Sequence, residues 1–436
     1  MLLEGRAAEI RDPVHGYVYA TEAEKAVIDN PVFQRMRRIR QLSGAHLTYP
    51  GAQHTRFEHM IGAMHLAGLA SQSLLAKIPL SKEELQEIRL AALLHDVGHG
   101  PFSHLFEEVM TEKNGLTHED MTMRIVKSSE VGEIIRGHGY DPEKMASFAV
   151  GLSPTRPTYM NDLIGGGLSV DIMDYLLRDS YFTGVEYGKV DVHRIINSFE
   201  VVEDRLALNH AALYAFEALL IARYEMFKAV YFHRTVRAAE VMLIKAISLA
   251  DSDLGLTDVS DLGRYLSLTD EILLERLANL KQTGSSAELK RAGELASDYR
   301  DRRLFKCVFE KVIQRHEKDR FIERLFAQKS IREELASEIA RRAGTDQDFI
   351  YVDVPETPSV PLTSSRQSLR NVTLVSRTKE GLVPEIVRVE ELPLVGAISG
   401  YMDILRIYTT VALRDRVAKA VGDLLGSGGY ASKVSM

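Results

Sequence analysis

An apolar helical run that ends in a histidine and an aspartate is the feature that most constrains this chain. Residues 90–94 are Leu-Ala-Ala-Leu-Leu, and His95 and Asp96 follow directly. Burial of an ionised carboxylate costs several kcal/mol unless a partner neutralises it, and a divalent cation is an economical partner. His99 lies four residues after His95, on the same helical face. Because the glycines and the proline of residues 98–101 end the helix, the pattern predicts a helix terminus at a metal-binding pocket.

The composition limits the class of protein. The chain has 436 residues, of which 45% are hydrophobic, so one large and one small domain are expected. The net charge of −7 disfavours general nucleic-acid binding, and the single Cys307 excludes an intrachain disulfide or a cysteine zinc finger. Residues 1–6 lack the apolar core of a signal peptide, and the apolar stretch 211–232 is interrupted by charged residues. We therefore expect a cytoplasmic protein that neither spans a membrane nor coats nucleic acid.

Hydrophobic periodicity predicts a mainly α fold. Residues 10–19 read as a short strand pair around a Pro/Gly turn, and Pro31 divides the helical pattern of residues 21–42 into two helices. Ser81 and Glu84 have the spacing of a capping box, which predicts that a helix starts at Lys82. Helices are expected over residues 21–42, 56–77, 82–98, 117–128, 169–182, 210–250 and 285–343.

Near residues 343–345 the helical periodicity gives way to short strand-like segments, which indicates a division into two domains. Short β-rich stretches follow, and strands are expected at residues 349–354, 386–389 and 405–409 before a helix at residues 415–425. The fold class is then a helical core over residues 1–344 with a small C-terminal α+β appendage over residues 345–436. Within the core, the metal-binding part is expected at about residues 50–182 and a substrate helix at about residues 210–240.

Three distant segments supply candidate metal ligands: His59, the His95-Asp96 pair and Asp171. Two imidazoles with two carboxylates suit a divalent transition metal such as Fe, Mn, Zn, Co or Ni, and they leave coordination positions for water. Open positions indicate catalysis. Taken singly, His59 is more readily interpreted as a core or surface histidine, and Asp171 as a helix cap or an exposed charge. The combination with the His-rich segment 95–104 is more specific.

These segments resemble the HD-domain phosphohydrolases, and in particular the dGTPase-like branch that contains the SAM-and-HD-domain deoxynucleoside triphosphate triphosphohydrolase. The helical core is then an HD domain, and the matching region spans roughly residues 10–240, whereas residues 345–436 carry no motif. The resemblance rests on residues 12–16, 29–37, 41–42, 50–59, 95–106, 117–119, 171–179 and 223–233.

The resemblance implies a reaction in which water attacks the α-phosphorus of a dNTP and releases a deoxynucleoside and triphosphate. His59, His95, Asp96 and Asp171 would hold the transition metal, and Mg²⁺ can accompany the substrate phosphates. The resemblance further implies a catalytic group of four residues that transfer a proton or position the residue that does so. These residues are His99, His104, Glu107 and His118.

Among the catalytic group, His104 is favoured as the acid that protonates the sugar O5′, with Glu107 and His118 in support. The plainer interpretation of His104 is a cap of the next helix.

The resemblance also implies a substrate-binding set. Arg56 and Arg223 match phosphate-binding arginines, and Tyr231 and His233 are expected on the same helix as Arg223. Leu42 and a tyrosine packed against C2′ of the sugar would exclude the 2′-hydroxyl of ribose. The carboxylate of Asp179 would accept a hydrogen bond from the 3′-hydroxyl. Tyr175 can equally be a core aromatic residue. The residues matched to the deoxyribose are Gln41, Leu42, Tyr175, Asp179 and Tyr231.

Asp29 and Arg37 match positions that bind a guanine nucleotide activator between subunits in some relatives. Four arginines between residues 35 and 40 are reasonable for triphosphate binding, although one helix can also carry them as solvated side chains. Ala8 and Glu9 stand where activated relatives have a basic residue. Effector control and a homodimer or homotetramer are therefore expectations from analogy alone.

Two alternatives to a dNTP triphosphohydrolase remain open. The chain could be an HD phosphohydrolase for a nucleoside monophosphate, (p)ppGpp or a cyclic nucleotide. It could also be a nucleotide-binding HD protein without catalysis. The matches at residues 41–42, 175, 179 and 223–233 favour the first interpretation, because a generic HD core does not require them.

Overall fold

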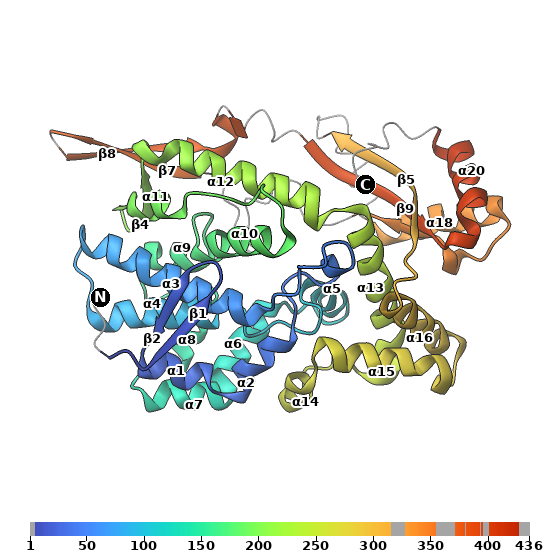
Figure 1. Cartoon of the computed structure of the whole chain (residues 1–436), viewed down its shortest axis with the longest axis horizontal. Coiled ribbons are helices and arrows are strands. Elements are labelled where there is room, and N and C mark those ends of the chain that lie inside the picture. Colours follow the sequence, from blue (N-terminus) through green and yellow to red (C-terminus); the bar gives the residue numbers. More distant parts are fainter. Residues whose placement is uncertain are drawn as a thin grey trace.

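The computed structural model describes residues 5–314, 328–354, 371–379, 381–392, 394–395 and 401–426. The fold is mainly helical, as predicted, with small sheets (Figure 1). The first helices are α1 (Glu22–Ile28), α2 (Pro31–Gln34), α3 (Arg56–Leu75), α4 (Lys82–Leu94), α5 (His104–Asn114), α6 (His118–Ser128), α7 (Glu130–Gly137), α8 (Pro142–Ala149), α9 (Thr158–Gly165), α10 (Val170–Thr183) and α11 (Val192–Asn197). The later helices are α12 (Leu213–Met226), α13 (Arg234–Leu254), α14 (Leu262–Ser267), α15 (Asp270–Thr283), α16 (Ala287–Arg300), α18 (Lys329–Ala343) and α20 (Arg414–Leu425).

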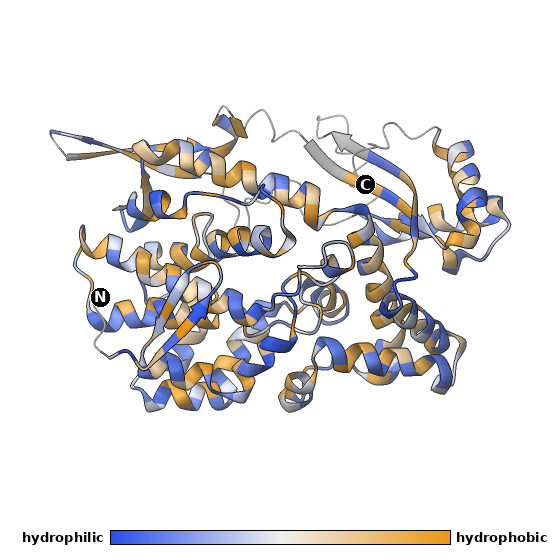
Figure 2. Cartoon of the chain, viewed as in Figure 1, coloured by the Kyte–Doolittle hydropathy of each residue, from blue (hydrophilic) through white to orange (hydrophobic). Residues whose placement is uncertain are grey.

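Helix α3 is the centre of the N-terminal half. Most of its side chains are buried, because it packs against α4 on one side and α10 on another. The surrounding helices alternate hydrophobic and hydrophilic residues along their length, as Figure 2 shows, and each turns its apolar stripe to the shared core. Local signals set the helix starts: Ser81 and Glu84 form the predicted capping box of α4, and Ser169 caps α10.

The strands form three small sheets in the described part of the chain. Strands β1 (Ala8–Asp12) and β2 (Gly16–Ala20) make the predicted hairpin. A second sheet has the order β3-β4-β7-β8 and a third the order β5-β9-β6. Their strands are β3 (Phe199–Val202), β4 (Arg205–Asn209), β5 (Lys306–Gln314), β6 (Tyr351–Asp353), β7 (Asn371–Thr378), β8 (Gly381–Arg388) and β9 (Tyr401–Thr409).

Both larger sheets combine strands from the two sides of residue 344. β4 pairs in parallel with β7, and β5 pairs with β9. The division of the chain at residue 344 stays a prediction about domain organisation, and hydrogen bonds join the segments on either side of it.

Three long helices expected from the periodicity are interrupted. The helical pattern of residues 21–42 stops at Arg38 after a 3-10 turn, and Arg40 instead makes a β-bridge with Thr55. The segment 210–250 breaks at a π-helical turn, Phe227–Tyr231, before α13 begins. The segment 285–343 contains strand β5. In each case a tertiary contact or a strand pairing outweighs the local helical preference.

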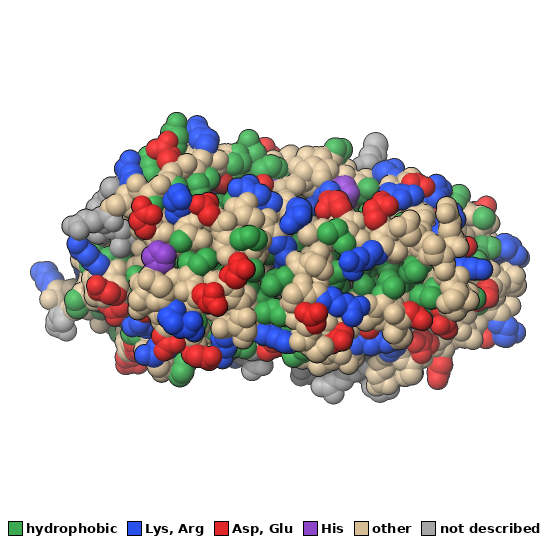
Figure 3. Space-filling model, turned by 90° about the horizontal axis from the view of Figure 1, so that it is seen from below, with side chains coloured by type: hydrophobic (Ala, Val, Ile, Leu, Met, Phe, Trp, Pro, Cys, Tyr) green, Lys and Arg blue, Asp and Glu red, His purple; other side chains and the backbone are tan. Residues whose placement is uncertain are grey.

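Two further observations concern the surface. Among the described helices, none combines the length and the apolarity that a bilayer crossing requires. On the face shown in Figure 3, acidic and basic side chains are interspersed. The described residues of this face therefore do not form the one-sided basic stripe that nucleic-acid-binding surfaces carry.

Candidate active site

Helix termini bring the four predicted metal ligands next to one another. His59 lies in the first turns of α3, which a capping box starts. His95 and Asp96 follow the end of α4, one turn earlier than the sequence suggested. Asp171 lies in the first turn of α10. Since α3 packs against both α4 and α10, side chains from three distant segments converge on one point.

The distances between the ligand atoms suit a single small cation. His59 Nε2 and His95 Nε2 are 3.2 Å apart. Asp171 Oδ1 lies 3.1 Å from His59 Nε2 and 3.5 Å from His95 Nε2. Asp96 Oδ1 lies 3.4 Å from His95 Nε2, and Asp96 Oδ2 lies 3.6 Å from His59 Nε2. The four side chains thus present two nitrogens and two carboxylates to a common centre.

The hydrogen bonds of the two imidazoles test whether this centre fits a metal. His59 Nδ1 lies 2.8 Å from Asp174 Oδ2, and His95 Nδ1 lies 2.8 Å from Ala92 O. Both partners only accept, so each Nδ1 carries a hydrogen and each Nε2 is left to bind either a proton or a metal ion. Two lone pairs that face each other repel unless a cation stands between them. The donor set therefore fits a divalent metal.

The electrostatics of the metal-free centre agree. Burial opposes a charge on His59, but hydrogen bonds with Asp171 and Asp174 outweigh it and raise the pKa of His59 to about 10. Burial likewise opposes the charge of Asp96, but Arg56 outweighs it and holds the pKa of this carboxyl well below its usual value. The site is thus built for positive charge beside ionised carboxylates.

Asp96 and Ser103 fix the position of the Arg56 side chain within the site. Its guanidinium pairs with Asp96, and its Nε donates to Ser103 Oγ over 2.7 Å. Ser103 and Phe102 both have a positive φ, of 54° and 57°, which residues with a side chain rarely adopt. Asp270 holds this turn, because its Oδ1 accepts from the Phe102 amide over 2.7 Å. Such strained residues concentrate at functional sites.

The predicted catalytic group forms a second cluster beside the first. Glu107 Oε2 lies 2.8 Å from His104 Nδ1, and Glu107 Oε1 lies 2.7 Å from His118 Nδ1. The rings of His99 and His118 stack with centroids 3.9 Å apart. Burial raises the pKa of Glu107, but His118 and His104 outweigh it and hold that pKa far below its usual value. Glu107 is therefore an ionised bridge between two imidazoles.

His99 joins the two clusters, and Gly98 leaves room for them to approach each other. His99 Nε2 lies 3.4 Å from Asp96 Oδ1, so the buried His99 touches both. Gly98 permits the approach of α6, since a Cβ at this position would lie 2.1 Å from His118 O and 2.2 Å from Thr122 N. Any larger residue at position 98 would separate His118 from the turn that carries the metal ligands.

Part of the predicted substrate set forms a third group. Asp179 Oδ1 lies 2.7 Å from His54 Nε2, and Asp179 Oδ2 accepts from the Tyr231 hydroxyl over 2.6 Å. Burial raises the pKa of the Tyr175 hydroxyl, which hydrogen-bonds with Arg223. Apart from His54, which lies just before α3, these residues come from α10, α12 and the π turn, so segments that lie about 50 residues apart share one polar group.

Gln41 and Leu42 lie in the loop after the arginine run. Gln41 Oε1 is buried and has no hydrogen-bond partner among the described residues, which leaves one acceptor for a ligand. Leu42 is half-buried and packs with Tyr49 against Ala45 and Val236. The structure therefore gives Gln41 an open polar atom and Leu42 an apolar contact.

The remaining predicted residues lie apart from these groups. The prediction that His233 lies on the same helix as Arg223 is wrong. His233 is the N-cap of α13, where its Nδ1 accepts from the Thr235 amide over 3.2 Å. Asp29 is exposed and pairs with Lys25 at 2.8 Å, and Arg37 is exposed over the ring of Phe57.

The arginine run is not a single cationic surface. Arg35 is buried and donates to His99 O over 2.9 Å and to Leu268 O over 3.0 Å. Arg37 and Arg38 are exposed. The run therefore divides into a structural arginine beneath the site and solvated arginines outside it, because the 3-10 turn points its members in different directions.

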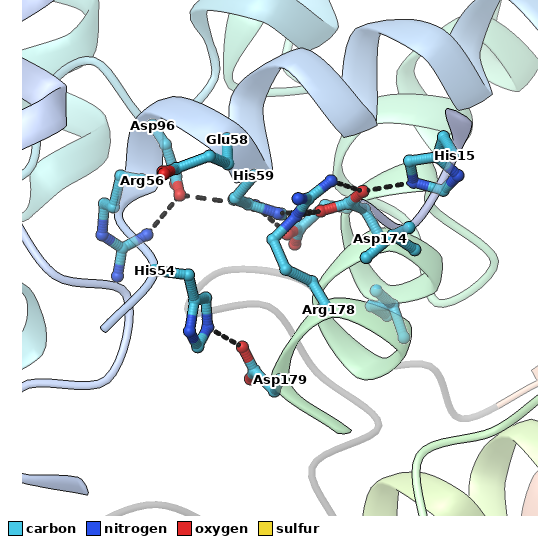
Figure 4. A network of polar contacts seen from close by, with 12 residues as sticks. His15, His54, Arg56, Glu58, His59, Asp96, Asp174, Arg178 and Asp179 are labelled. Atoms are coloured by element: carbon cyan, nitrogen blue, oxygen red, sulfur yellow. Dashed lines mark hydrogen bonds and ion pairs between the residues drawn. The ribbon is translucent and has the colours of Figure 1, made fainter. Parts of the chain in front are cut away.

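Figure 4 shows a network of polar side chains around His59, several of which the sequence analysis left without a role. Asp174 and Arg178 lie behind His59, and His15 reaches Asp174 from the hairpin; Asp12 completes the group. His54 contacts Asp179. A signal for some of them was present, because Asp171, Asp174 and Arg178 follow the i, i+3, i+7 spacing of one helical face.

Curated proteins of related sequence include one uncharacterized bacterial protein and one named triphosphohydrolase. The uncharacterized protein YwfO of Bacillus subtilis is 38% identical over 251 residues, covering 55% of this chain and 55% of that protein. The deoxynucleoside triphosphate triphosphohydrolase SAMHD1 homolog of Dictyostelium discoideum is 31% identical over 321 residues, covering 70% of this chain and 60% of that protein. The chain thus spans little more than half the length of these curated relatives.

A solved structure and two family matches define the group. The crystal structure of a hypothetical protein from Aquifex aeolicus has a TM-score of 0.72 and 28% identity, and it covers 95% of this chain and 99% of that one. Residues 56–179 match the HD domain, which includes all four predicted metal ligands, and residues 190–427 match the HD associated region. The chain therefore belongs to the HD-domain family and carries the associated region of that family.

Proposed function

We propose that this protein is a metal-dependent phosphohydrolase that converts a dNTP to a deoxynucleoside and triphosphate. The observation that carries the proposal is the contact between the two clusters. His99 joins the two-histidine, two-carboxylate centre to the His104–Glu107–His118 group. A metal centre and a proton-transfer group within one contact of each other suit hydrolysis of a phosphate ester.

His59, His95, Asp96 and Asp171 would hold the divalent metal. When bound, it supplies Lewis-acid activation of water and of a phosphate oxygen. Arg56 lies against Asp96, where a guanidinium can stabilise the charge that develops on the α-phosphate.

His104 is the group suited to protonate the leaving sugar oxygen. Its Nδ1 is engaged by Glu107, so its Nε2 is the atom that can deliver a proton to O5′. The side chain is 68% exposed, which leaves it accessible to a substrate. Glu107 orients the ring, and His118 lies on the far side of that carboxylate.

The sugar would lie against the Asp179 group. Asp179 can accept a hydrogen bond from the 3′-hydroxyl, and the hydroxyl of Tyr231 fixes the carboxylate. Tyr175, together with Gln41 and Leu42, would border C2′ and disfavour ribose by crowding. The relation to the Dictyostelium SAMHD1 homolog supports a dNTP in preference to other nucleotides.

Product analysis tests the proposal. Purified protein is incubated with each dNTP and rNTP and with Mn²⁺, Mg²⁺, Fe²⁺ or Co²⁺, and the products are separated by ion-pair chromatography. Deoxynucleoside with intact triphosphate, formed from dNTPs in preference to rNTPs, is the expected result. Release of orthophosphate or pyrophosphate as the main product would reject it and favour another HD phosphohydrolase.

Assembly and control belong to the same proposal. We propose a homodimer or homotetramer, with Asp29 and Arg37 exposed for a guanine nucleotide between subunits. GTP and dGTP are added to the assay with a second dNTP, and the molar mass is followed by light scattering. Unchanged turnover and unchanged mass would reject nucleotide control.

A further inference from the structure

The carboxylate of Asp174 is the meeting point of a buried polar network that lies behind the candidate metal centre (Figure 4). Its Oδ1 accepts from His15 Nε2 over 2.6 Å and from Arg178 Nη2 over 2.9 Å. Its Oδ2 accepts from His59 Nδ1 over 2.8 Å and from Arg178 Nε over 2.9 Å. Four donors occupy two oxygens, so the orientation of this side chain is fully determined.

The network continues into the turn of the β1–β2 hairpin. Arg178 Nη1 donates to Asp12 Oδ2 over 2.8 Å. Asp12 Oδ1 accepts from the amides of Val14 and His15 over 2.9 and 2.8 Å. His15, whose side chain is 5% exposed, thus holds Asp174 by its ring while its own amide is held by Asp12. The hairpin turn and the ligand His59 are therefore connected through an unbroken series of hydrogen bonds.

The backbone of α3 is shaped for this network. A Cβ at Gly62 would lie 1.8 Å from Asp174 Oδ1 and 2.4 Å from Arg178 Nη2. Glycine in a helix interior is less favourable than alanine. Its presence at position 62 makes room for the ion pair at the expense of helix propensity.

We propose that His15, Asp174 and Arg178 are positioning residues for the metal ligand His59, and that they couple metal binding to the order of the hairpin turn. A carboxylate on Nδ1 fixes the tautomer and the ring angle of a ligating histidine, and loss of such a partner lowers metal affinity about 10–100-fold. Coupling is reciprocal, so metal binding stabilises the turn by the free energy with which the turn stabilises the metal. The inference rests on the metal centre of the proposed function but not on its substrate.

Metal binding alone provides the first test. Chelator-stripped protein is titrated with Mn²⁺ in a calorimeter, for the wild type, Asp174→Asn, His15→Ala and Gly62→Ala. The proposal predicts an affinity loss of about 10–100-fold in Asp174→Asn and a smaller loss in the other two. Matched controls are Asp253→Asn, at an exposed carboxylate on α13, and Gly137→Ala, whose added methyl meets open space. Affinities within twofold of the wild type in all three network variants would overturn the proposal.

Hydrogen exchange provides a second test, and its first measurement uses the unmutated protein alone. Mn²⁺ should slow amide exchange in the peptide that contains Val14 and His15, and this slowing should shrink in Gly62→Ala. A purely structural role predicts equal exchange with and without Mn²⁺, and that result would overturn the coupling. At saturating Mn²⁺, kcat of Gly62→Ala should recover toward that of the wild type. A protein that binds Mn²⁺ in this manner but releases no triphosphate would refute only the proposed function.

Discussion

Replacement of Glu107 by glutamine tests the role of the second cluster. Glu107 accepts from His104 Nδ1 at 2.8 Å, from His118 Nδ1 at 2.7 Å and from the His118 amide at 3.0 Å. Glutamine keeps the length of the side chain but retains a single acceptor oxygen. At least one of the two imidazoles then faces an NH₂ donor in place of a carboxylate, and the negative charge between them is lost.

The magnitude follows from the role of the bridged pair. General acid–base groups contribute about 10²- to 10⁴-fold to turnover, so kcat should fall by that factor, or about 3–5 kcal/mol in activation free energy. The pH dependence should change as well. Burial lowers the pKa of His118, but the charge of Glu107 outweighs it and keeps that pKa above its usual value. Without Glu107, His118 loses its proton at lower pH, so the alkaline limb of the rate profile should shift downward.

The assay measures deoxynucleoside release from a dNTP at saturating Mn²⁺ between pH 5.5 and pH 9.5, values that bracket the ordinary histidine pKa of about 6.5. Glu112→Gln, at a half-exposed residue of the same helix that pairs with Lys329, is the matched control and should retain wild-type turnover. Bound metal is quantified in every variant. Wild-type kcat in Glu107→Gln, or a loss of metal that accounts for the whole defect, would refute the reasoning.

Three further predictions concern the metal centre and the sugar group. The double variant His95→Ala/Asp96→Ala removes two of the four ligands, and we expect neither Mn²⁺ binding by calorimetry nor turnover; stoichiometric Mn²⁺ in this variant would contradict the assigned ligand set. Tyr231→Phe removes the 2.6 Å hydrogen bond to Asp179, and KM for a dNTP should rise about tenfold with unchanged metal content. In the chelator-treated protein, the pKa of His59 is raised from 6.5 to about 10. Its stabilising contribution is fully present below about pH 6.5 and is lost as pH rises toward 10, so the urea midpoint should fall over that range, and a midpoint that rises would exclude this linkage.

Much of the fold follows from local sequence patterns. The strand pair before Thr21, the starts of α3, α4, α6 and α10, and parts of strands β6, β8 and β9 were predicted, because caps and hydrophobic periodicity act over a few residues. The β3–β4 hairpin and strands β5 and β7 were not predicted. Strand β4 pairs with β7 and strand β5 with β9, between segments that lie up to about 170 residues apart, and a local pattern does not record such contacts.

The candidate site divides in the same manner. Residue type and spacing predicted His59, His95, Asp96 and Asp171 as metal ligands, and the structure brings these four side chains together. Residue type and spacing did not assign a role to Asp174, because in the sequence it is one of several polar residues of α10. The structure shows that its carboxylate contacts His59, His15 and Arg178.

The sequence by itself predicted the starts of α3, α4, α6 and α10 and named four candidate metal ligands by residue type and spacing. Only the tertiary structure decided that Arg35 is a buried support and Arg37 a solvated side chain, although both stand in one cationic run. It also decided that the N-terminal hairpin reaches the metal ligand through Asp174. The physical reason is range: propensity and capping act along the chain, whereas burial and charge pairing depend on neighbours that the fold brings from far away.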